Sequence, residues 1–412
     1  MLNMSSQANL ALYGGKPVRQ KPLPPMHPSA TSIAHEEMAA VEEVLKAQSL
    51  YRYYGPQFLD RTKAFEGAFA EFIGVRHALA VNSGTSALHC ALVGCGIGPG
   101  DEVIIPTYAW ISCPSTVVMC GASPVLANID KSLTLDPSDI ADRVTDKTKA
   151  IMAVHIRGVS CDLDAIQKVA KKYELKLIED CAQAVGGKYG QKRLGGIGDV
   201  GTFSFQLNKM ISAGEGGALA TNDLGIYERA EMFHDSGAPY RRKYDREVIP
   251  GVNYRMNEIS ATIMTEQLKK IDVIIELMRK SKEKIKKGIS DISGLSFRKL
   301  PSSKEGDVAV CLVFYVPTAE KAMEFKRALQ AENIYTPSGG YPPVLLDPES
   351  FDGHVFVHWT HIFKNLGKIL DKYSRTMDLL SRAVHLDISP LLSEEDIDSI
   401  IVGTHKIAEA LL

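Results

Sequence analysis

The chain is 412 residues long, 45% hydrophobic and 23% charged, with a formal net charge of −2 at pH 7. This length exceeds one ordinary domain and permits a large buried core. The balanced charge, without basic stretches interleaved with aromatic residues, argues against a nucleic-acid partner, and the lack of an 18-residue apolar run argues against a membrane span.

The seven cysteines include no CxxC pair, and most of them lie in apolar stretches. This distribution favours reduced, buried thiols over disulfides or a metal site. The first 20 residues lack the apolar core of a signal peptide. We therefore expect a soluble cytoplasmic protein that holds no metal.

Residues 1–30 are rich in proline, glycine and serine, which predicts an extended arm. Helices are expected over 32–48 and 61–72. The loop between them has an aromatic and basic character, supplied by Tyr51, Arg52, Tyr53 and Tyr54. These residue types alone are compatible with an edge of the core.

The centre of the chain alternates predicted strands and helices. Strands are expected at 77–81, 102–106, 124–129, 150–155, 175–179 and 200–205, and helices at 137–142 and 162–173. This βαβ alternation predicts an α/β fold with a mostly parallel sheet and right-handed crossovers.

Two junctions after strands carry residues suited to a ligand. Residues 82–88 (NSGTSAL) turn from a strand into a helix, and their backbone N–H groups would favour an anion, although a plain N-cap by Ser83 or Thr85 explains the same residues. Residues 107–112 are expected to open a helix. Within them, Trp110 is by residue type most simply a core anchor. His155 ends a strand and is either a structural histidine or a cavity residue.

A carboxylate and a lysine then occur at two neighbouring strand ends. Asp180 closes the apolar strand 175–179, and Lys209 follows the strand 200–205 in a glycine-rich loop. Open α/β sheets place ligands at such ends. With the hydroxyl of Ser204 to bond a phosphate, the set suits pyridoxal phosphate: the lysine forms a Schiff base, and the aspartate keeps the pyridine nitrogen protonated. For an isolated pair, a solvated lysine and a capping aspartate are the simpler interpretation.

The rest of the chain predicts a charged surface loop over 235–246, a long helix over 258–290 and a linker near 291–306. The smaller C-terminal unit is expected to contain the following elements: a strand at 308–316, helices at 318–333 and 393–411, and a Pro/Gly turn at 336–343. The expected division is an arm at 1–30, a large cofactor-binding domain at 31–290 and a small α/β domain at 291–412.

Several segments together resemble the DegT/DnrJ/StrS family of sugar aminotransferases. These segments are residues 179–184 (EDCAQA), 201–205 (GTFSF), Lys209, 214–218 (GEGGA) and 251–258 (GVNYRMNE). The resemblance covers nearly the whole chain. It implies a pyridoxal-phosphate-dependent enzyme of fold type I, with a mostly parallel seven-stranded sheet in its large domain.

The resemblance also assigns roles to single residues. It places Gly84, Thr85, Ser86 and Ser204 at the cofactor phosphate, Trp110 and Gln183 at the ring and its hydroxyl, and Asp180 and Lys209 in catalysis. Asn253 would reach the phosphate of a partner subunit, so a homodimer with shared sites is implied. The loop at 51–54 would approach the substrate.

The implied reaction transfers an amino group from an amino acid, glutamate or glutamine, to the ketone of a keto-sugar or cyclitol in amino-sugar biosynthesis. One alternative is a dehydratase or aromatising enzyme of the same family, and another is a non-catalytic regulator that binds the cofactor. Relatives often have histidine after the segment 341–343 and at the place of Val185, whereas this chain does not. These departures concern the substrate side of the site.

Overall fold

The computed structural model describes residues 7–302, 304–334 and 372–412. Its main sheet has seven strands in the order β1-β9-β8-β5-β4-β2-β3. The strands are β1 His77–Val81, β2 Glu102–Pro106, β3 Ser123–Ala127, β4 Thr148–Val154, β5 Lys176–Asp180, β8 Val200–Ser204 and β9 Gly217–Thr221. Only β9 runs against its neighbours β1 and β8. The predicted α/β fold with a mostly parallel seven-stranded sheet is confirmed.

β9 is the one strand of this sheet that the sequence did not predict, because its residues (GALAT) lack the β-branched and aromatic signal of a strand. Small residues are required at its start. A Cβ added at Gly217 would lie 2.3 Å from the carbonyl oxygen of Ser83. The absence of a side chain at Gly217 therefore allows the two backbones to approach closely.

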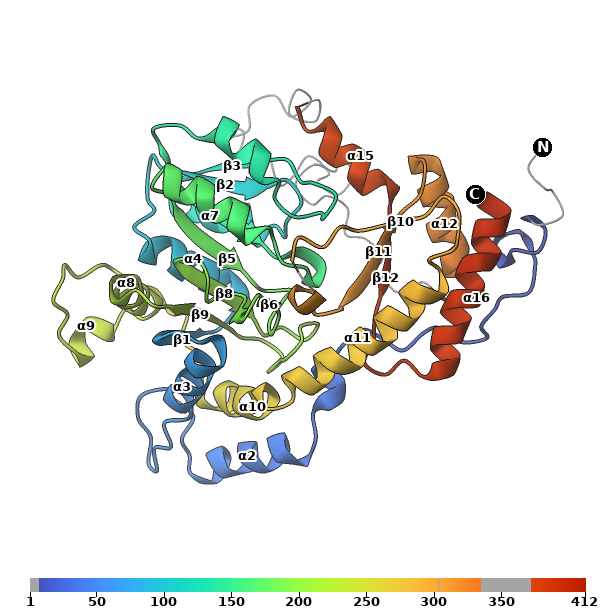
Figure 1. The fold of residues 1–412 in the computed structure, drawn as a ribbon. Coiled ribbons are helices and arrows are strands. Elements are labelled where there is room, and N and C mark those ends of the chain that lie inside the picture. The colour runs from blue at the N-terminus through green and yellow to red at the C-terminus, as the bar shows by residue number, and fades with distance from the viewer. Residues whose placement is uncertain (1–6, 303, 335–371) are drawn as a thin grey trace.

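Helices cover both faces of the sheet (Figure 1). The helices of this part are α2 His35–Lys46, α3 Arg61–Ile73, α4 Gly84–Gly94, α5 Ser112–Met119, α6 Pro137–Ile140, α7 Leu163–Lys172, α8 Leu224–His234 and α9 Ala238–Arg241. α7 shows the reason for the packing: it buries Leu163, Ile166 and Ala170 against the sheet and turns Lys171 and Lys172 outward. Short 3-10 turns occur at η1 Ala11–Tyr13, η2 Ala30–Ser32, η3 Ala141–Arg143, η4 Ile156–Gly158 and η5 Lys304–Gly306.

Three local expectations were wrong. The long helix predicted over 258–290 is two helices, α10 Glu258–Leu268 and α11 Ile271–Gly288, which meet where the Lys270 ammonium pairs with Glu37 of α2. The predicted surface loop at 235–246 contains α9, and its Asp235 is fully buried because it pairs with arginines 241 and 255. α5 begins only at Ser112, so Trp110 lies in the loop before it.

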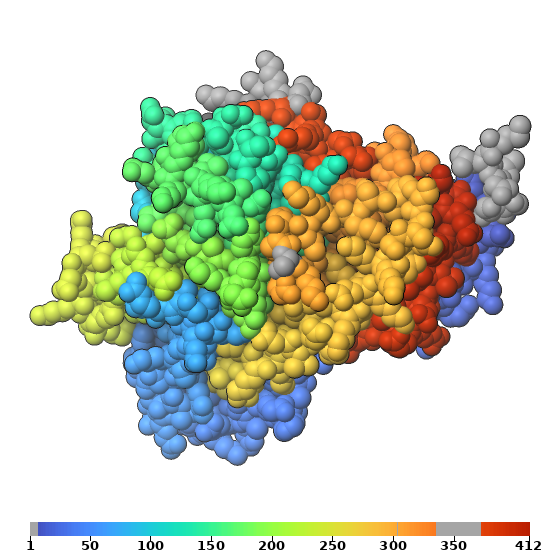
Figure 2. Space-filling view, in the orientation of Figure 1, coloured from blue at the N-terminus to red at the C-terminus, as the bar shows by residue number. Residues whose placement is uncertain are grey.

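A second, antiparallel sheet of three strands contains β10 Ser296–Phe297, β11 Cys311–Tyr315 and β12 Ala383–Asp387. It carries α12 Ala319–Ala331, α15 Ser374–Arg382 and α16 Glu394–Leu411. A small hairpin pairs β6 Lys188–Tyr189 with β7 Lys192–Arg193. In Figure 2, α11 runs along the surface from the N-terminal helices to the region of the second sheet. The turn expected at 336–343 lies outside the described residues, and the domain boundaries at 30 and 290 stay predictions.

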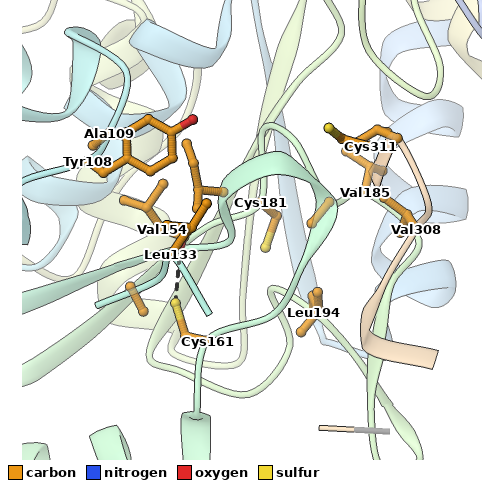
Figure 3. Packing of buried hydrophobic residues seen from close by; sticks show 14 of the residues in the cluster. Tyr108, Ala109, Leu133, Val154, Cys161, Cys181, Val185, Leu194, Val308 and Cys311 are labelled. Carbon is orange, nitrogen blue, oxygen red and sulfur yellow. Dashed lines mark hydrogen bonds between the residues drawn. The ribbon is translucent and has the colours of Figure 1, made fainter. Parts of the chain in front are cut away.

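The hydrophobic core around the seven-stranded sheet continues into the core around the three-stranded sheet. Figure 3 shows Val308 and Cys311, from the chain leading into and beginning β11, close to Val185 of the main unit. Below the end of β4, the thiol of Cys161 donates to the carbonyl of Val154 at 3.2 Å. All seven cysteines are free thiols. Within the described ranges, no helix combines the length and apolar character needed to cross a membrane.

The N-terminal arm is docked along α12 and α16 (Figure 1). The backbone N–H groups of Ala11 and Val18 donate to the two carboxylate oxygens of Glu332, at 2.9 and 2.7 Å. Glu332 is fully buried and also pairs with Lys406 of α16 at 2.7 Å. Arg19 pairs with Asp396 of the same helix at 2.6 Å. The arm therefore forms part of the packed fold.

The start of α3 is capped by a residue distant in sequence. Asp60 precedes the helix with a left-handed φ of 54° and makes no capping bond with its side chain. Instead Glu258 of α10, fully buried, accepts the backbone N–H groups of Arg61 at 2.6 Å and Thr62 at 2.9 Å. A carboxylate at a helix N-terminus satisfies orphan donors and complements the helix dipole.

We expect Glu258→Ala to lower the free energy of unfolding by about 3 kcal/mol, because it leaves buried donors of α3 without a charged acceptor. Chemical denaturation followed by circular dichroism measures this loss. Glu42→Ala is the control, since Glu42 forms only an exposed pair with Lys46 and should cost under about 0.5 kcal/mol. Equal losses in both variants would contradict a capping role for Glu258.

Candidate active site

A cavity of about 260 Å³ opens at the carboxyl ends of β4, β5 and β8. Parallel strands end at a common edge, which is where open α/β sheets bind ligands. Seven of the nine residues expected at the cofactor line this cavity: Gly84, Thr85, Trp110, Asp180, Gln183, Ser204 and Lys209. The fold thus brings together residues that are up to 125 positions apart in the chain.

Asp180 is held in one orientation at the end of β5. It is nearly buried; its Oδ1 accepts the backbone N–H of Ala182 at 2.9 Å, and its Oδ2 accepts the thiol of Cys113 at 3.2 Å. Burial, and next the charge of Asp180, raise the pKa of Cys113 well above its usual range. The thiol therefore remains a donor, and the carboxylate presents a fixed negative charge to the cavity.

Lys209 lies in the loop after β8, where its backbone N–H bonds to the carbonyl of Gln206 at 2.9 Å. The side chain is half-buried. Burial lowers the pKa of its amine; the charge of Asp180 opposes this shift, and the charge of Arg157 adds to it. A lowered pKa favours the neutral amine, which is the nucleophilic form. Because its side chain is half-buried, Lys209 is not a fully solvated lysine. Because burial lowers the pKa of its amine, it also differs from a structural cation held by ion pairs.

The N-terminus of α4 supplies a cup for an anion. The Ser83 side chain caps this helix by accepting the N–H of Ser86 at 3.1 Å, and Thr85 Oγ1 lies 2.8 Å from Ser112 Oγ. Ser204 of β8 closes the other side, so near that a Cβ added at Gly84 would lie 2.7 Å from the Ser204 Cβ. The cup joins several hydroxyl donors to the positive end of a helix of 11 residues.

Trp110 and Gln183 form further parts of the cavity wall. The Trp110 side chain is 48% exposed, so the interpretation as a core anchor is wrong. Gln183 Oε1 accepts the backbone N–H of Arg157 at 2.9 Å. This bond occupies the amide oxygen and leaves the NH₂ group of Gln183 as a donor for a ligand.

The structure does not bring every expected residue to the cavity. The Ser86 hydroxyl bonds to Asn82 at 2.6 Å and Ser83 at 2.8 Å, and Asn253 is exposed outside the cavity wall. In the aromatic-basic loop, Arg52 is buried and pairs with Glu66 at 2.6 Å. None of residues 51–54 lines the cavity.

His155 lines the cavity, but both of its ring nitrogens are already used. Nδ1 accepts the backbone N–H of Cys161 at 3.0 Å, so Nε2 carries the proton and donates to Glu179 at 3.2 Å. Glu179 also accepts the N–H groups of Gly195, Ile197 and Gly198. His155 is therefore a structural histidine. The nearby group of His155, Glu179 and Cys181 is committed to holding this loop rather than to coordinating an ion.

Sequence reasoning missed Cys113, Ser112 and Arg157 as neighbours of the site. Each contacts a predicted residue through a bond that joins separate elements: Cys113 with Asp180, Ser112 with Thr85, and Arg157 with Gln183. No local pattern marks such partners. Only the position of Ser112 and Cys113, two and three residues after Trp110, gave a weak signal.

A half-buried lysine whose amine pKa is lowered by burial, a fixed carboxylate and an anion cup, placed at the edge of this seven-stranded sheet, are the groups that a pyridoxal-phosphate-dependent enzyme of fold type I requires. The particular family follows from comparison with known sequences. The profile of the DegT/DnrJ/EryC1/StrS aminotransferase family matches residues 31–404, and the chain belongs to this family.

Relatives act on different acceptors. GDP-perosamine synthases of Caulobacter vibrioides and Escherichia coli O157:H7 are 46% identical over 209 residues and 36% identical over 335 residues. These alignments cover 50% and 81% of this chain and 56% and 86% of the relatives, so the chain spans about half the length of the Caulobacter protein. An L-glutamine:2-deoxy-scyllo-inosose aminotransferase of Streptoalloteichus tenebrarius is 37% identical over 287 residues, covering 67% of this chain and 66% of that protein.

Among solved structures, 3-amino-5-hydroxybenzoic acid synthase matches with a TM-score of 0.81 at 28% identity, covering 95% of this chain and 99% of that one. DesV of S. venezuelae, solved in complex with a ketimine intermediate, matches with a TM-score of 0.79 at 28% identity, and the match covers 94% of this chain and 99% of that one. The fold is therefore shared along nearly the whole length.

We expect Gly84→Ala to weaken the binding of pyridoxal phosphate at least about tenfold, roughly 1.4 kcal/mol, because the new Cβ would press on Ser204 and fill the cup. Quenching of tryptophan fluorescence on titration of the cofactor-free protein measures this affinity. Gly98→Ala is the control, since a Cβ at Gly98 meets nothing within 4 Å. Unchanged affinity in a folded Gly84→Ala protein would argue against the cup as the phosphate site.

Proposed function

We propose that the protein is a pyridoxal-phosphate-dependent aminotransferase that moves an amino group from glutamate or glutamine to the ketone of a keto-sugar or cyclitol in amino-sugar biosynthesis. The observation that carries this proposal is that one cavity holds both the Lys209 side chain, whose amine pKa is lowered by burial, and the fixed carboxylate of Asp180. Family membership supports the reaction type, and the names of the relatives support the class of acceptor.

The donors and charges around the cavity fit pyridoxal phosphate. The N-terminus of α4 with Thr85 and Ser204 would hold the phosphate, Trp110 would cover the ring, and Gln183 would donate to the ring hydroxyl. When bound, the cofactor supplies a protonated pyridine ring that withdraws electrons from the bonds at the reacting carbon. Asp180 would keep that ring protonated, since its oxygens already accept two other bonds that fix its orientation.

The chain's own contribution to chemistry centres on Lys209. Its neutral amine can attack a carbonyl carbon, and after release it is a base that takes the proton from the Cα of the amino-acid donor. The same Nζ would give this proton up to the cofactor's reacting carbon within that half of the reaction, and in the second half it would carry a proton in the opposite direction, to the carbon of the acceptor ketone. Partial burial at the cavity wall limits competing protonation by water.

A second candidate is a dehydratase or aromatising reaction. The likeness to 3-amino-5-hydroxybenzoic acid synthase, at 28% identity over 95% of this chain, supports it. The product of the reaction separates the two candidates. Transfer of ¹⁵N from labelled glutamate or glutamine to a sugar or cyclitol ketone, followed by mass spectrometry, favours the first candidate. A non-catalytic regulator would transfer no label.

The proposal includes a cytoplasmic homodimer with shared sites. A phosphate dianion requires several donors, and the N-terminus of α4 with the hydroxyls of Thr85 and Ser204 would supply part of them. Asn253 is exposed on the single chain, next to the buried Asp235 with which it forms an isolated bridge. A twofold interface would place each Asn253 at the partner's cup.

We expect Lys209→Ala to abolish ¹⁵N transfer, a loss of at least about 10³-fold, because Lys209 is the one lysine among the described residues that line the cavity. Borohydride reduction of the loaded wild-type protein, followed by peptide mapping, should attach the cofactor to Lys209. Lys188→Ala is the matched control, because this lysine lies in the small hairpin away from the cavity and should leave transfer unchanged. A label on a different lysine would overturn the assignment.

We expect hybrids of Lys209→Ala and Asn253→Ala subunits to regain activity that neither parent has. In each hybrid dimer, one site has both an intact lysine and an intact asparagine from the partner. Up to about half of the wild-type activity per hybrid should appear when subunits are mixed and re-separated by affinity tags. Lack of recovery in verified hybrids, or a fully active monomer by light scattering, would contradict shared sites.

A further inference from the structure

Arg157 is held rigidly at the edge of the site without being a predicted site residue. It lies in η4, directly after β4, and its backbone has a left-handed φ of 52°, which is unfavourable for a residue with a side chain. Its N–H bonds to Gln183 at 2.9 Å, and the guanidinium of Arg298 donates to the carbonyls of Ile156 and Arg157 at 2.8 and 3.3 Å. These bonds fix an otherwise costly conformation.

The guanidinium of Arg157 is buried against the second sheet, with 2% of the residue exposed. It pairs with Asp387 of β12, whose side chain is 1% exposed, and it also donates to the thiol of Cys311 of β11 at 3.0 Å. Figure 3 shows Cys311 at this junction between the two parts of the molecule. A buried ion pair of this kind is costly to break by removing one partner.

Asp387 and Cys311 both contact the Arg157 guanidinium, and of these two groups Asp387 carries the charge. Burial raises the pKa of Cys311, so its thiol stays neutral. Burial, followed by the charge of Arg157, lowers the pKa of the neighbouring His385 well below its usual range, so that imidazole is neutral too. The positive charge of Arg157 is therefore compensated from the side of the second sheet.

Arg157 and Lys209 line the same small cavity, about 30 Å³, together with Gln183. The other titratable groups of the described residues that line the cavities of Lys209 are Asp180, the structural His155 and the exposed Glu215. Arg157 lowers the pKa of the Lys209 amine, after burial and against the charge of Asp180. Arg157, whose guanidinium is paired with Asp387 of the second sheet, thus lies at the wall of a cavity that Lys209 also lines.

We propose that Arg157 and Asp387 form a positioning pair that sets the electrostatic field at the Lys209 amine, so that the second sheet tunes the reactivity of a lysine carried by the main sheet. The inference rests on the proposed function, because it concerns the lysine that performs the transfer. Neither residue of the pair touches the reacting atoms; Arg157 acts through its charge and through Gln183, and Asp387 acts through Arg157.

Variants that remove one charge at a time separate this role from simple packing, because they shift the Lys209 titration in opposite directions. Asp387→Asn leaves the Arg157 cation uncompensated, which should lower the pKa of Lys209 by about one unit. Arg157→Gln removes the cation and leaves the Asp387 charge, which should raise the pKa by about one unit. In the double variant the pKa should return to within about half a unit of the wild-type value.

The pKa is measured on the full-length chain without cofactor, from the pH dependence of acylation of Lys209, read by peptide mass spectrometry. The loaded protein gives a second reading, from the pH at which its visible absorption changes. Asp139→Asn is the matched control, because Asp139 pairs with Arg143 away from both cavities and should leave both readings unchanged.

Opposite shifts with recovery in the double variant would establish the pair. Shifts in the same direction, or none in variants whose circular dichroism matches the wild type, would overturn it. If one single variant fails to fold, the other and the double variant still give the sign of the effect. Peptide mapping of the cofactor-bound lysine remains separate: a label away from Lys209 refutes the proposed function, whereas a null titration refutes only the pair.

Discussion

The edge of the main sheet depends on two consecutive carboxylates at the end of β5. Successive strand residues face opposite sides, so Glu179 and Asp180 serve different purposes. Burial alone would raise the pKa of Glu179, but His155 and then the loop N–H groups keep it low and ionised. Its charge holds the turn before β8 in place. Asp180, on the other side, is free to face the cavity.

The site also requires that three segments of the chain approach one another closely, and small residues allow this approach. A side chain at Gly84 would strike Ser204, and one at Gly217 would strike the carbonyl of Ser83. These contacts bring the start of α4 against β8 and β9, so the positive helix end and the hydroxyl of Ser204 meet within one cavity. Binding of an anion there is built into the backbone geometry, and side chains mainly close the cup.

The sequence predicted the parts of the molecule that local signals encode. Apolar runs gave six of the seven main strands, and the ends of those strands gave Asp180 and Lys209, because parallel strands share an edge. β9 was missed because its strand character comes from pairing between β1 and β8. The break before α11 and the burial of Asp235 depend on remote charged partners. Arg157 was missed for the same reason, since Asp387 lies 230 positions away.

The docking of the N-terminal arm has a consequence for the order of events during synthesis. Residues 11 to 19 are synthesised before Glu332 and Asp396, the residues whose carboxylates hold them in the fold. At about 5–20 residues per second, the arm waits on the order of tens of seconds for its binding surface. Residues 11–19 are thus made well before the surface on which they pack. Until the segments that contain Glu332 and Asp396 have been made, they remain available to proteases and chaperones.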